Sequence, residues 1–320
     1  MHQETPSAAP VVIDEASFFT VRGVPQWVTI RGRDRANPAV LVLHGPGYAL
    51  STMPALYRPW ERAFTVIHWD QPGAGATYGR SPDAALSIDR IARDGIALLE
   101  QLRPRFGRAL LFAISGGTVV GLTIARRRPD LVAAYAGCGQ ITCWARQEAL
   151  GYTQALADAR AAGDVAAVDA LTRIGPPPYP DAATDAIKAR HVGAMTSVEQ
   201  AALAALLAAQ ASEGGPRRAP ETAYADPMEL SLQTYSKLRA ELVAFDARAA
   251  APTLEVPVLC LQGARDRVTP TAEVAAYLDE LRAPSKRLER IEGAGHSAFL
   301  LRDALLEALV RGARPFAEGR

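Results

Sequence analysis

Three residues with complementary chemistry occur in the order serine, aspartate, histidine. Ser115 follows the apolar run 109–114 and precedes two glycines and a helix-compatible segment, and Asp266 and His296 each follow a later apolar run. A serine at a sharp turn between a strand and a helix can be held exposed as a nucleophile. A hydroxyl needs a base to remove its proton, and the base works best when a third group orients it. The sequence therefore predicts Ser115 as nucleophile, His296 as base and Asp266 as the orienting group.

Each of the three residues also has a structural alternative. Ser115 could cap the helix that follows it, Asp266 could cap a helix or stabilise a turn, and His296 could cap the final helix. What favours chemistry is their shared context, because each follows a strand-like run. Ligands gather outside the carboxyl ends of the strands in open parallel sheets.

The other four histidines occupy less suitable positions. His2 lies in the first ten residues, His68 lies inside an apolar run, and His191 lies in a helix-rich region. His44 follows a strand-like run but precedes a Gly-Pro-Gly turn early in the chain. Only His296 occupies the place that a base for Ser115 requires.

The elements that must position these residues alternate between strand and helix. Apolar runs predict strands at 18–22, 26–31, 39–43, 64–69, 109–114, 131–137, 256–262 and 287–291, and helical periodicity predicts helices at 88–102, after Ser115, at 271–282 and at 297–310. Such alternation indicates a mostly parallel sheet flanked by helices. Alanine-rich helical segments interrupt the pattern. We predict a flexible tail at 1–15, an α/β core at 16–140 and 250–320, and a helical cap at 141–249.

Composition excludes several functional classes. The chain has 320 residues, 49% hydrophobic and 22% charged, with a net charge of +1. No basic surface for nucleic acid and no membrane-spanning segment is expected. Its three cysteines have neither disulfide nor zinc-site spacing, so we expect no metal or cofactor and a reducing, cytoplasmic location. The oligomeric state is left open.

The segments around these residues resemble the proline iminopeptidase-like group of the α/β-hydrolases. The matching segments are 43–47 (Leu-His-Gly-Pro-Gly), 68–75 (His-Trp-Asp-Gln-Pro-Gly-Ala-Gly), the turn at Ser115, 263–270 and 292–296. The resemblance implies the α/β-hydrolase fold and covalent catalysis, in which Ser115 attacks an acyl carbon and water later releases the acyl group. It also implies an oxyanion hole formed by the N–H groups of Gly45 and Gly116, with Gly47 as the alternative to Gly45 or a hole with one weak half, and substrate contacts from Glu148, Gly47 and Gln140.

Three departures from the family pattern concern the pocket. The family turn His-Gly-Gly-Pro-Gly lacks one glycine here, which places Pro46, a residue without an N–H, directly after Gly45. Pro72 stands where the family commonly has arginine, in a segment that we interpret as a structural turn. The elbow has Gly116 where the family usually has a bulky residue, so we expect open space beside the serine.

Aminopeptidase specificity requires a carboxylate that binds the free amino terminus of the substrate. The candidates in the cap are Glu148, Glu199, Glu221 and Glu229, of which Glu148 is closest in sequence to the core. The aromatic-flanked glutamate motif of well-known proline iminopeptidases is absent.

These observations predict a serine hydrolase that cleaves a small amide, a short peptide or an ester. The first alternative is an esterase or lactone hydrolase of secondary metabolism. The second is a ligand-binding protein on a hydrolase scaffold, with weak turnover or none.

Overall fold

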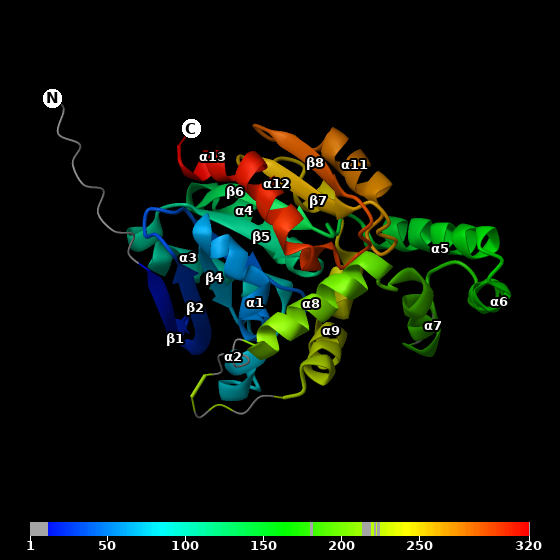
Figure 1. Cartoon of the computed structure of the whole chain (residues 1–320), viewed down its shortest axis with the longest axis horizontal. Helices are drawn as coiled ribbons and strands as arrows, with labels where there is room; N and C mark the ends of the chain where they lie inside the picture. The colour runs from blue at the N-terminus through cyan, green and yellow to red at the C-terminus, as the bar shows by residue number, and fades with distance from the viewer. Residues whose placement is uncertain (1–11, 180–181, 213–218, 221, 223–224, 320) are drawn as a thin grey trace.

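A computed structural model describes residues 12–179, 182–212, 219–220, 222 and 225–319. Its centre is an eight-stranded sheet in the order β1-β2-β4-β3-β5-β6-β7-β8 (Figure 1). The strands are β1 Ile13–Val21, β2 Val24–Gly32, β3 Ala39–Leu43, β4 Thr65–Trp69, β5 Ala109–Ile114, β6 Val132–Cys138, β7 Val258–Gly263 and β8 Lys286–Ile291. The β1–β2 and β2–β4 pairs are antiparallel and all other pairs are parallel, which confirms the predicted mostly parallel sheet.

The continuous apolar strands are buried on both faces. In β3, Leu41 and Leu43 belong to one hydrophobic core, and Val40 and Val42 belong to a second. This alternation follows from the two-residue period of a strand, which sends successive side chains to opposite faces. Strands β3 to β8 pair in parallel, so they share one orientation and their carboxyl ends meet along one edge of the sheet.

Helices cover both faces of the sheet. The first core is completed by α3 (Ile88–Phe106), α4 (Gly117–Arg127) and α11 (Thr271–Glu280). The second is completed by α1 (Pro54–Tyr57), α12 (Arg302–Gly312) and the neighbouring α13 (Arg314–Ala317). The remaining short core elements are α2 (Gly75–Arg80), η1 (Leu50–Thr52), η2 (Arg58–Arg62), η3 (Pro129–Leu131) and η4 (Ala298–Leu300).

The helical segment between β6 and β7 forms a cap. It contains α5 (Trp144–Ala161), α6 (Val165–Ile174), α7 (Ala182–Val192), α8 (Ser197–Ser212), α9 (Pro227–Ala244) and α10 (Ala247–Ala250). Helices α5, α6 and α7 extend beyond the sheet to the right in Figure 1. Aspartates cap three of these helices: Asp164 accepts from Ala167 N at the start of α6, Asp226 accepts from Met228 N and Glu229 N at the start of α9, and Asp246 accepts from Arg248 N at the start of α10.

Two sequence boundaries were wrong. A tail is predicted through residue 15, but β1 begins at Ile13, because that strand pairs with β2 along its length and buries Ile13. The final helix is predicted at 297–310, but the chain first forms η4, and α12 begins only at Arg302. Residues 1–11 lie outside the described part of the chain.

The cap is joined to the core through backbone groups. Thr234 Oγ1 of α9 donates to the carbonyl of Gly73, and Glu241 Oε2 of α9 accepts from Ile88 N. On α5, Gly151 packs against the backbone carbonyl of Arg267, so closely that a Cβ at residue 151 would overlap that oxygen. The β7–α11 loop and the cap therefore fit together only because residue 151 has no side chain.

We expect Gly151→Ala to lower both stability and hydrolytic activity. The added methyl meets a backbone carbonyl, which cannot rotate away as a flexible side chain could, so α5 or the loop must shift, at a cost of about 1–3 kcal/mol. Urea unfolding measures this cost. Ala157→Ser, on an exposed position of the same helix, is the matched control. Equal stability of the two variants would contradict the tight fit.

Candidate active site

Ser115 occupies a strained turn between β5 and α4. Its φ of +50° lies in the left-handed region that residues with a side chain rarely adopt. Its N–H donates to the carbonyl of Cys138 at 2.9 Å, which ties the turn to the end of β6. A Cβ at Gly117 would overlap the carbonyl of Leu43, so strand and helix meet at backbone distance. This is the strand–turn–helix geometry predicted from the sequence.

The structure brings the three chemically complementary residues together. Ser115 Oγ lies 2.9 Å from His296 Nε2, and His296 Nδ1 lies 3.0 Å from Asp266 Oδ2. The other oxygen, Asp266 Oδ1, accepts from the N–H groups of Val268 and Thr269, each at 2.8 Å. The carboxylate is therefore fixed by its own loop and directs one oxygen at the imidazole.

Interaction with Asp266 makes His296 bind a proton more tightly than an ordinary histidine does. Burial alone would lower the pKa of His296, but the adjacent Asp266 carboxylate and its hydrogen bond, followed by the charge of Glu199, raise the pKa overall. Burial alone would raise the pKa of Asp266, but His296 and the hydrogen bonds from Thr269 outweigh burial and lower it. Such an arrangement can accept a proton from a serine hydroxyl and stabilise the resulting imidazolium.

The turn after β3 is held by a buried, neutral histidine. His44 Nδ1 lies 2.7 Å from the carbonyl of Gly45, and His44 Nε2 accepts from the N–H of Gln71 at 3.3 Å. The side-chain amide of Gln71 also donates to the His44 carbonyl at 3.2 Å. Burial lowers the pKa of His44 to about 4. The Asp70-Gln71 segment is thus the structural turn predicted from the sequence, and its role is to fix the shape of residues 44–47.

The expected open space beside Ser115 is filled by Pro46. A Cβ at Gly116 would lie 2.6 Å from Pro46 Cδ, so the proline ring occupies the position that a side chain at residue 116 would need. Pro46 and Gly116 both line the cavity above Ser115. In the described part of the chain, the N–H groups of Gly45 and Gly116 donate to no backbone acceptor.

A cavity of about 840 Å³ lies between the cap and the core. Its lining is mostly apolar near the serine. The apolar lining residues are Pro46, Ile141, Trp144, Tyr179, Ala189, Val192, Leu232, Tyr235, Leu242 and Val268. The volume exceeds what a single small residue would occupy and lies within the range of small-molecule sites.

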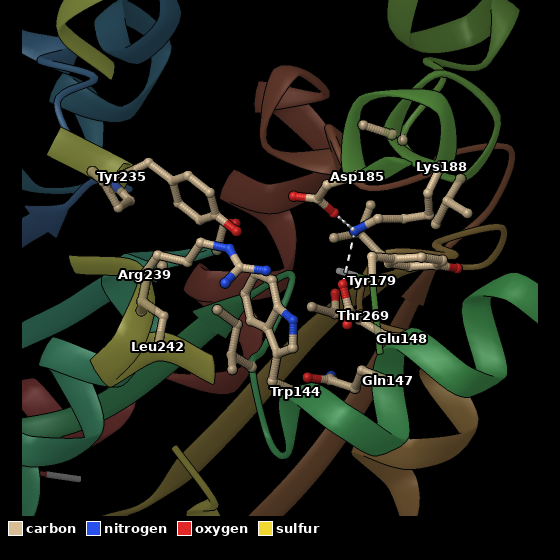
Figure 2. A pocket seen from close by; sticks show the side chains of 18 of the residues that line it. Trp144, Gln147, Glu148, Tyr179, Asp185, Lys188, Tyr235, Arg239, Leu242 and Thr269 are labelled. Atoms are coloured by element: carbon tan, nitrogen blue, oxygen red, sulfur yellow. Dashed lines mark hydrogen bonds and ion pairs between the residues drawn. The ribbon is translucent and has the colours of Figure 1, made fainter. Parts of the chain in front are cut away.

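One wall of the cavity carries a charged cluster (Figure 2). Lys188 Nζ of α7 lies 2.8 Å from Glu148 Oε1 of α5 and 2.9 Å from Asp185 Oδ1. Its ammonium also faces the Tyr179 ring, 5.5 Å from the ring centroid. Within this cluster, two carboxylates around one ammonium leave a formal charge of −1; Arg239 and the Asp158-paired Arg267 line other parts of the cavity. Arg239 and Tyr235 project from α9 on the opposite side of the view in Figure 2.

Of the three substrate contacts expected from the sequence, only Glu148 lines the cavity. Glu148 lines the cavity, but Gln140 does not; its side chain accepts from the Tyr135 hydroxyl at 2.6 Å and donates to the Ile141 carbonyl at 2.7 Å. Gly47 packs beneath α9, where a Cβ would lie 2.6 Å from the Leu230 carbonyl oxygen.

Among the remaining candidate glutamates, Glu199 and Glu229 do not line the cavity. Glu199 is fully buried, and Glu229 is an exposed residue of α9. Glu221 lies outside the described residues. Lys188 and Asp185 were missed in the sequence because nothing in the spacing of α5 and α7 reveals which charges face one another.

The described residues contain neither a metal-ligating cluster nor a membrane-spanning helix. In that part of the chain, no group of three or more His, Cys, Asp or Glu side chains could hold a metal ion. No described helix is long and apolar enough to cross a membrane.

Comparison with known proteins assigns the family. Residues 38–303 match the family model of the alpha/beta hydrolase fold. The chain is an α/β-hydrolase. This α/β-hydrolase is also 28% identical, over 310 residues, to the probable aminopeptidase YbaC of Bacillus subtilis (strain 168), with 92% of this chain and 95% of the relative covered.

Solved structures share the same fold. A proline iminopeptidase-related protein from Thermus thermophilus superposes with a TM-score of 0.63 at 20% identity, covering 94% of this chain and 99% of that one. An enol-lactonase from Burkholderia xenovorans superposes with a TM-score of 0.60 at 18% identity, covering 92% and 98%. The aminopeptidase name of the Bacillus relative agrees with the resemblance to the proline iminopeptidase-like group.

The neutral His44 makes the stability of this hydrolase depend on pH. Its pKa is lowered from 6.5 to about 4 in the folded chain, so the unfolded chain binds more protons between these values and stability falls as pH decreases through this window. Asp70, whose pKa burial raises to about 6, acts in the opposite direction. The contribution of His44 therefore appears only when a variant is compared with the native chain.

The free energy of unfolding should fall less between pH 7 and pH 5 in His44→Gln than in the native chain, by about 1–2 kcal/mol. Denaturant unfolding at both pH values measures the difference, with the partly buried His191→Gln as control. If native protein and His44→Gln lose the same free energy, His44 is not neutral in the folded state.

Proposed function

We propose that this chain is a serine hydrolase that works through an acyl-enzyme, with Ser115 as nucleophile, His296 as base and Asp266 as the orienting carboxylate. The observation that carries the proposal is the continuous hydrogen-bonded series from Ser115 Oγ to His296 to Asp266, with a left-handed serine that opens into the cavity. This combination matches the requirements for activating a hydroxyl.

The proton follows the hydrogen bonds. Ser115 Oγ attacks the acyl carbon while its proton passes to His296 Nε2, and the carbonyl oxygen becomes an oxyanion. His296 then protonates the leaving amine or alcohol, and the acyl group stays on Ser115. Water, deprotonated by His296, attacks the ester and regenerates the free serine. Asp266 remains a carboxylate throughout and holds Nδ1–H of the imidazole.

The N–H groups of Gly116 and Gly45 are the proposed donors to the oxyanion. Both are free of backbone acceptors in the described residues, and the two glycines are neighbours, since a Cβ at Gly45 would lie 3.9 Å from Gly116 N. One such donor contributes about 3 kcal/mol to transition-state stabilisation in comparable sites. Pro46, between Gly45 and Gly47, supplies shape but no hydrogen.

A fluorophosphonate probe tests the nucleophile. The probe phosphonylates a serine whose hydroxyl is activated and releases fluoride. We therefore expect stoichiometric labelling of the native chain and none of Ser115→Ala, as measured by intact mass. Ser236→Ala removes another serine hydroxyl from the same cavity and serves as the matched control, which should label normally. A native chain that resists the probe would favour the alternative of a ligand-binding protein on a hydrolase scaffold.

For the substrate, we propose an amide with a free amino terminus, as the aminopeptidase name of the Bacillus relative suggests. The support in the cavity is its charged wall, where Glu148 and Asp185 share the single ammonium of Lys188. The residual negative charge can attract a substrate ammonium by charge-assisted hydrogen bonds. The apolar lining around Ile141, Trp144 and Leu242 suits an apolar first side chain.

The role of Glu148 is tested with paired substrates. Glu148→Gln makes the charged wall neutral, so we expect KM for a free-amine aminoacyl p-nitroanilide to rise about tenfold, equivalent to about 1.4 kcal/mol. Turnover of p-nitrophenyl acetate, which has no amine, should not change. Glu229→Gln, an exposed carboxylate of α9 outside the cavity, is the control. An unchanged KM for the anilide would refute the amine-binding role.

Ester or lactone hydrolysis is the alternative function. The specific observation in its favour is the mostly apolar lining of the cavity. Such a lining suits an uncharged ester or lactone. The enol-lactonase with the same fold shows that the scaffold accommodates such a substrate in that protein. Preference for acetate or lactone over any free-amine anilide in the same substrate panel would select this function.

A further inference from the structure

We propose that Glu199 is a positioning residue of the reaction: its buried carboxylate holds the loop that carries His296 and stabilises the imidazolium formed there. The inference rests on the proposed serine-hydrolase function. It gives a cap residue a role in the chemistry itself, in addition to the role of the cap in enclosing the cavity.

Glu199 is attached to its own helix by hydrogen bonds at the helix start. Glu199 lies in the first turn of α8 and is fully buried. Glu199 Oε2 accepts from Thr196 N at 2.8 Å, and Thr196 Oγ1 accepts from Glu199 N at 3.3 Å. This reciprocal pair is a capping box, which fixes the glutamate side chain at the start of a helix, where a negative charge is favoured.

Glu199 also contacts the loop that carries His296. Glu199 Oε1 accepts from Gly295 N at 2.8 Å, and Gly295 immediately precedes His296. A Cβ at residue 295 would lie 3.1 Å from Glu199 Oε2, so only a glycine allows the carboxylate to approach the loop this closely without displacement. One carboxylate therefore joins α8 of the cap to the residue next to the proposed base.

The charge of Glu199 contributes to the electrostatics of the imidazole. In the described residues, no lysine or arginine pairs with Glu199, so no nearby cation cancels its charge. Asp266 and Glu199 are the two carboxylates that raise the pKa of His296 against the effect of burial. Asp266 acts through direct contact, and Glu199 acts through the field of a neighbouring buried charge, which is weakly screened by solvent.

The other charged groups near His296 are less suited to this role. Arg265 and Glu292, on the two loops around the site, are exposed to solvent. Arg267 is engaged by the Asp158 carboxylate of α5. The Cys138 thiol is uncharged, because burial raises its pKa.

The geometry separates this role from substrate binding. Both oxygens of Glu199 are occupied by backbone N–H groups, and the residue does not line the cavity. A substrate ammonium would have to break one of these bonds in order to reach it. Glu148, by contrast, faces the cavity directly.

The test measures the imidazole of His296 in the full-length chain by NMR titration, together with the pH profile of kcat/KM on p-nitrophenyl acetate. Glu199→Gln removes the charge and keeps an acceptor oxygen. We expect the His296 pKa and the acid limb of the profile to move down together by at least about half a pH unit. Glu273→Gln removes a buried carboxylate that Arg146 and Arg248 neutralise, and should leave both unchanged.

Glu199→Asp separates charge from loop position. It keeps the charge but shortens the reach to Gly295 N, so we expect a His296 pKa close to the native value and a several-fold lower kcat. The proposal is overturned if the pKa falls equally in Glu199→Asp and Glu199→Gln, or does not move in Glu199→Gln. It is also overturned if Glu199→Gln raises KM only for free-amine substrates, because Glu199 is then a substrate contact.

Separate measurements test the serine-hydrolase function and the role of Glu199. If the native chain shows no Ser115-dependent turnover and resists the fluorophosphonate probe, the proposed function is wrong. The NMR titration needs no turnover, so it still decides whether Glu199 controls the protonation of His296.

Discussion

The site depends on the close backbone approach between the ends of β3 and β5. Gly117 sits against the carbonyl of Leu43 with no room for a Cβ, and Ser115 before it is forced to a φ of +50°. A left-handed serine costs about 1–3 kcal/mol of strain. This strain is tolerated because the sheet on both sides fixes the turn. Moving β5 away from β3 would relax Ser115 and also withdraw its hydroxyl from His296.

The cap and the core are coupled at three of the loops that surround the site. Helix α9 reaches the turn after β3, where Ser231 Oγ donates to the Pro46 carbonyl at 2.9 Å. Helix α8 reaches the histidine loop through Glu199, and α5 reaches the aspartate loop through Gly151. These contacts involve backbone groups of the core, so they fix where each loop lies. The cap therefore acts as a scaffold for the site as well as a wall of the cavity.

The sequence predicts the parts of this molecule whose signals are local. Apolar runs located all eight strands to within a few residues, except at the start of β1, and the glycines beside Ser115 and His296 marked two of the loops. The proximity of Ser115, Asp266 and His296 was also predictable, since parallel strands bring their carboxyl ends to one edge. Fold and candidate triad thus follow from patterns within single segments.

What could not be predicted depends on contacts between distant segments. Gln140 is adjacent to β6 and polar, which suits a substrate contact, yet its side-chain oxygen accepts from the hydroxyl of Tyr135 in β6. Glu148 is close in sequence to the core, but its partner Lys188 lies 40 residues further along the chain. Only the packing of α5 on α7 decides that these charges meet, and neither helix carries a pattern that specifies it.

The missing glycine of the turn and the glycine after the serine are best understood together. Pro46 occupies the space that a side chain at residue 116 would need, so a bulky residue there and this shortened turn are sterically incompatible. The departures from the family pattern at these two positions are therefore one compensated change. Its consequence is local: the proline ring replaces the usual side chain as the wall beside Ser115, while the N–H of Gly116 is retained. Hydrogen bonds from His44, Gln71 and Ser231 hold this turn and so fix the position of the proline ring.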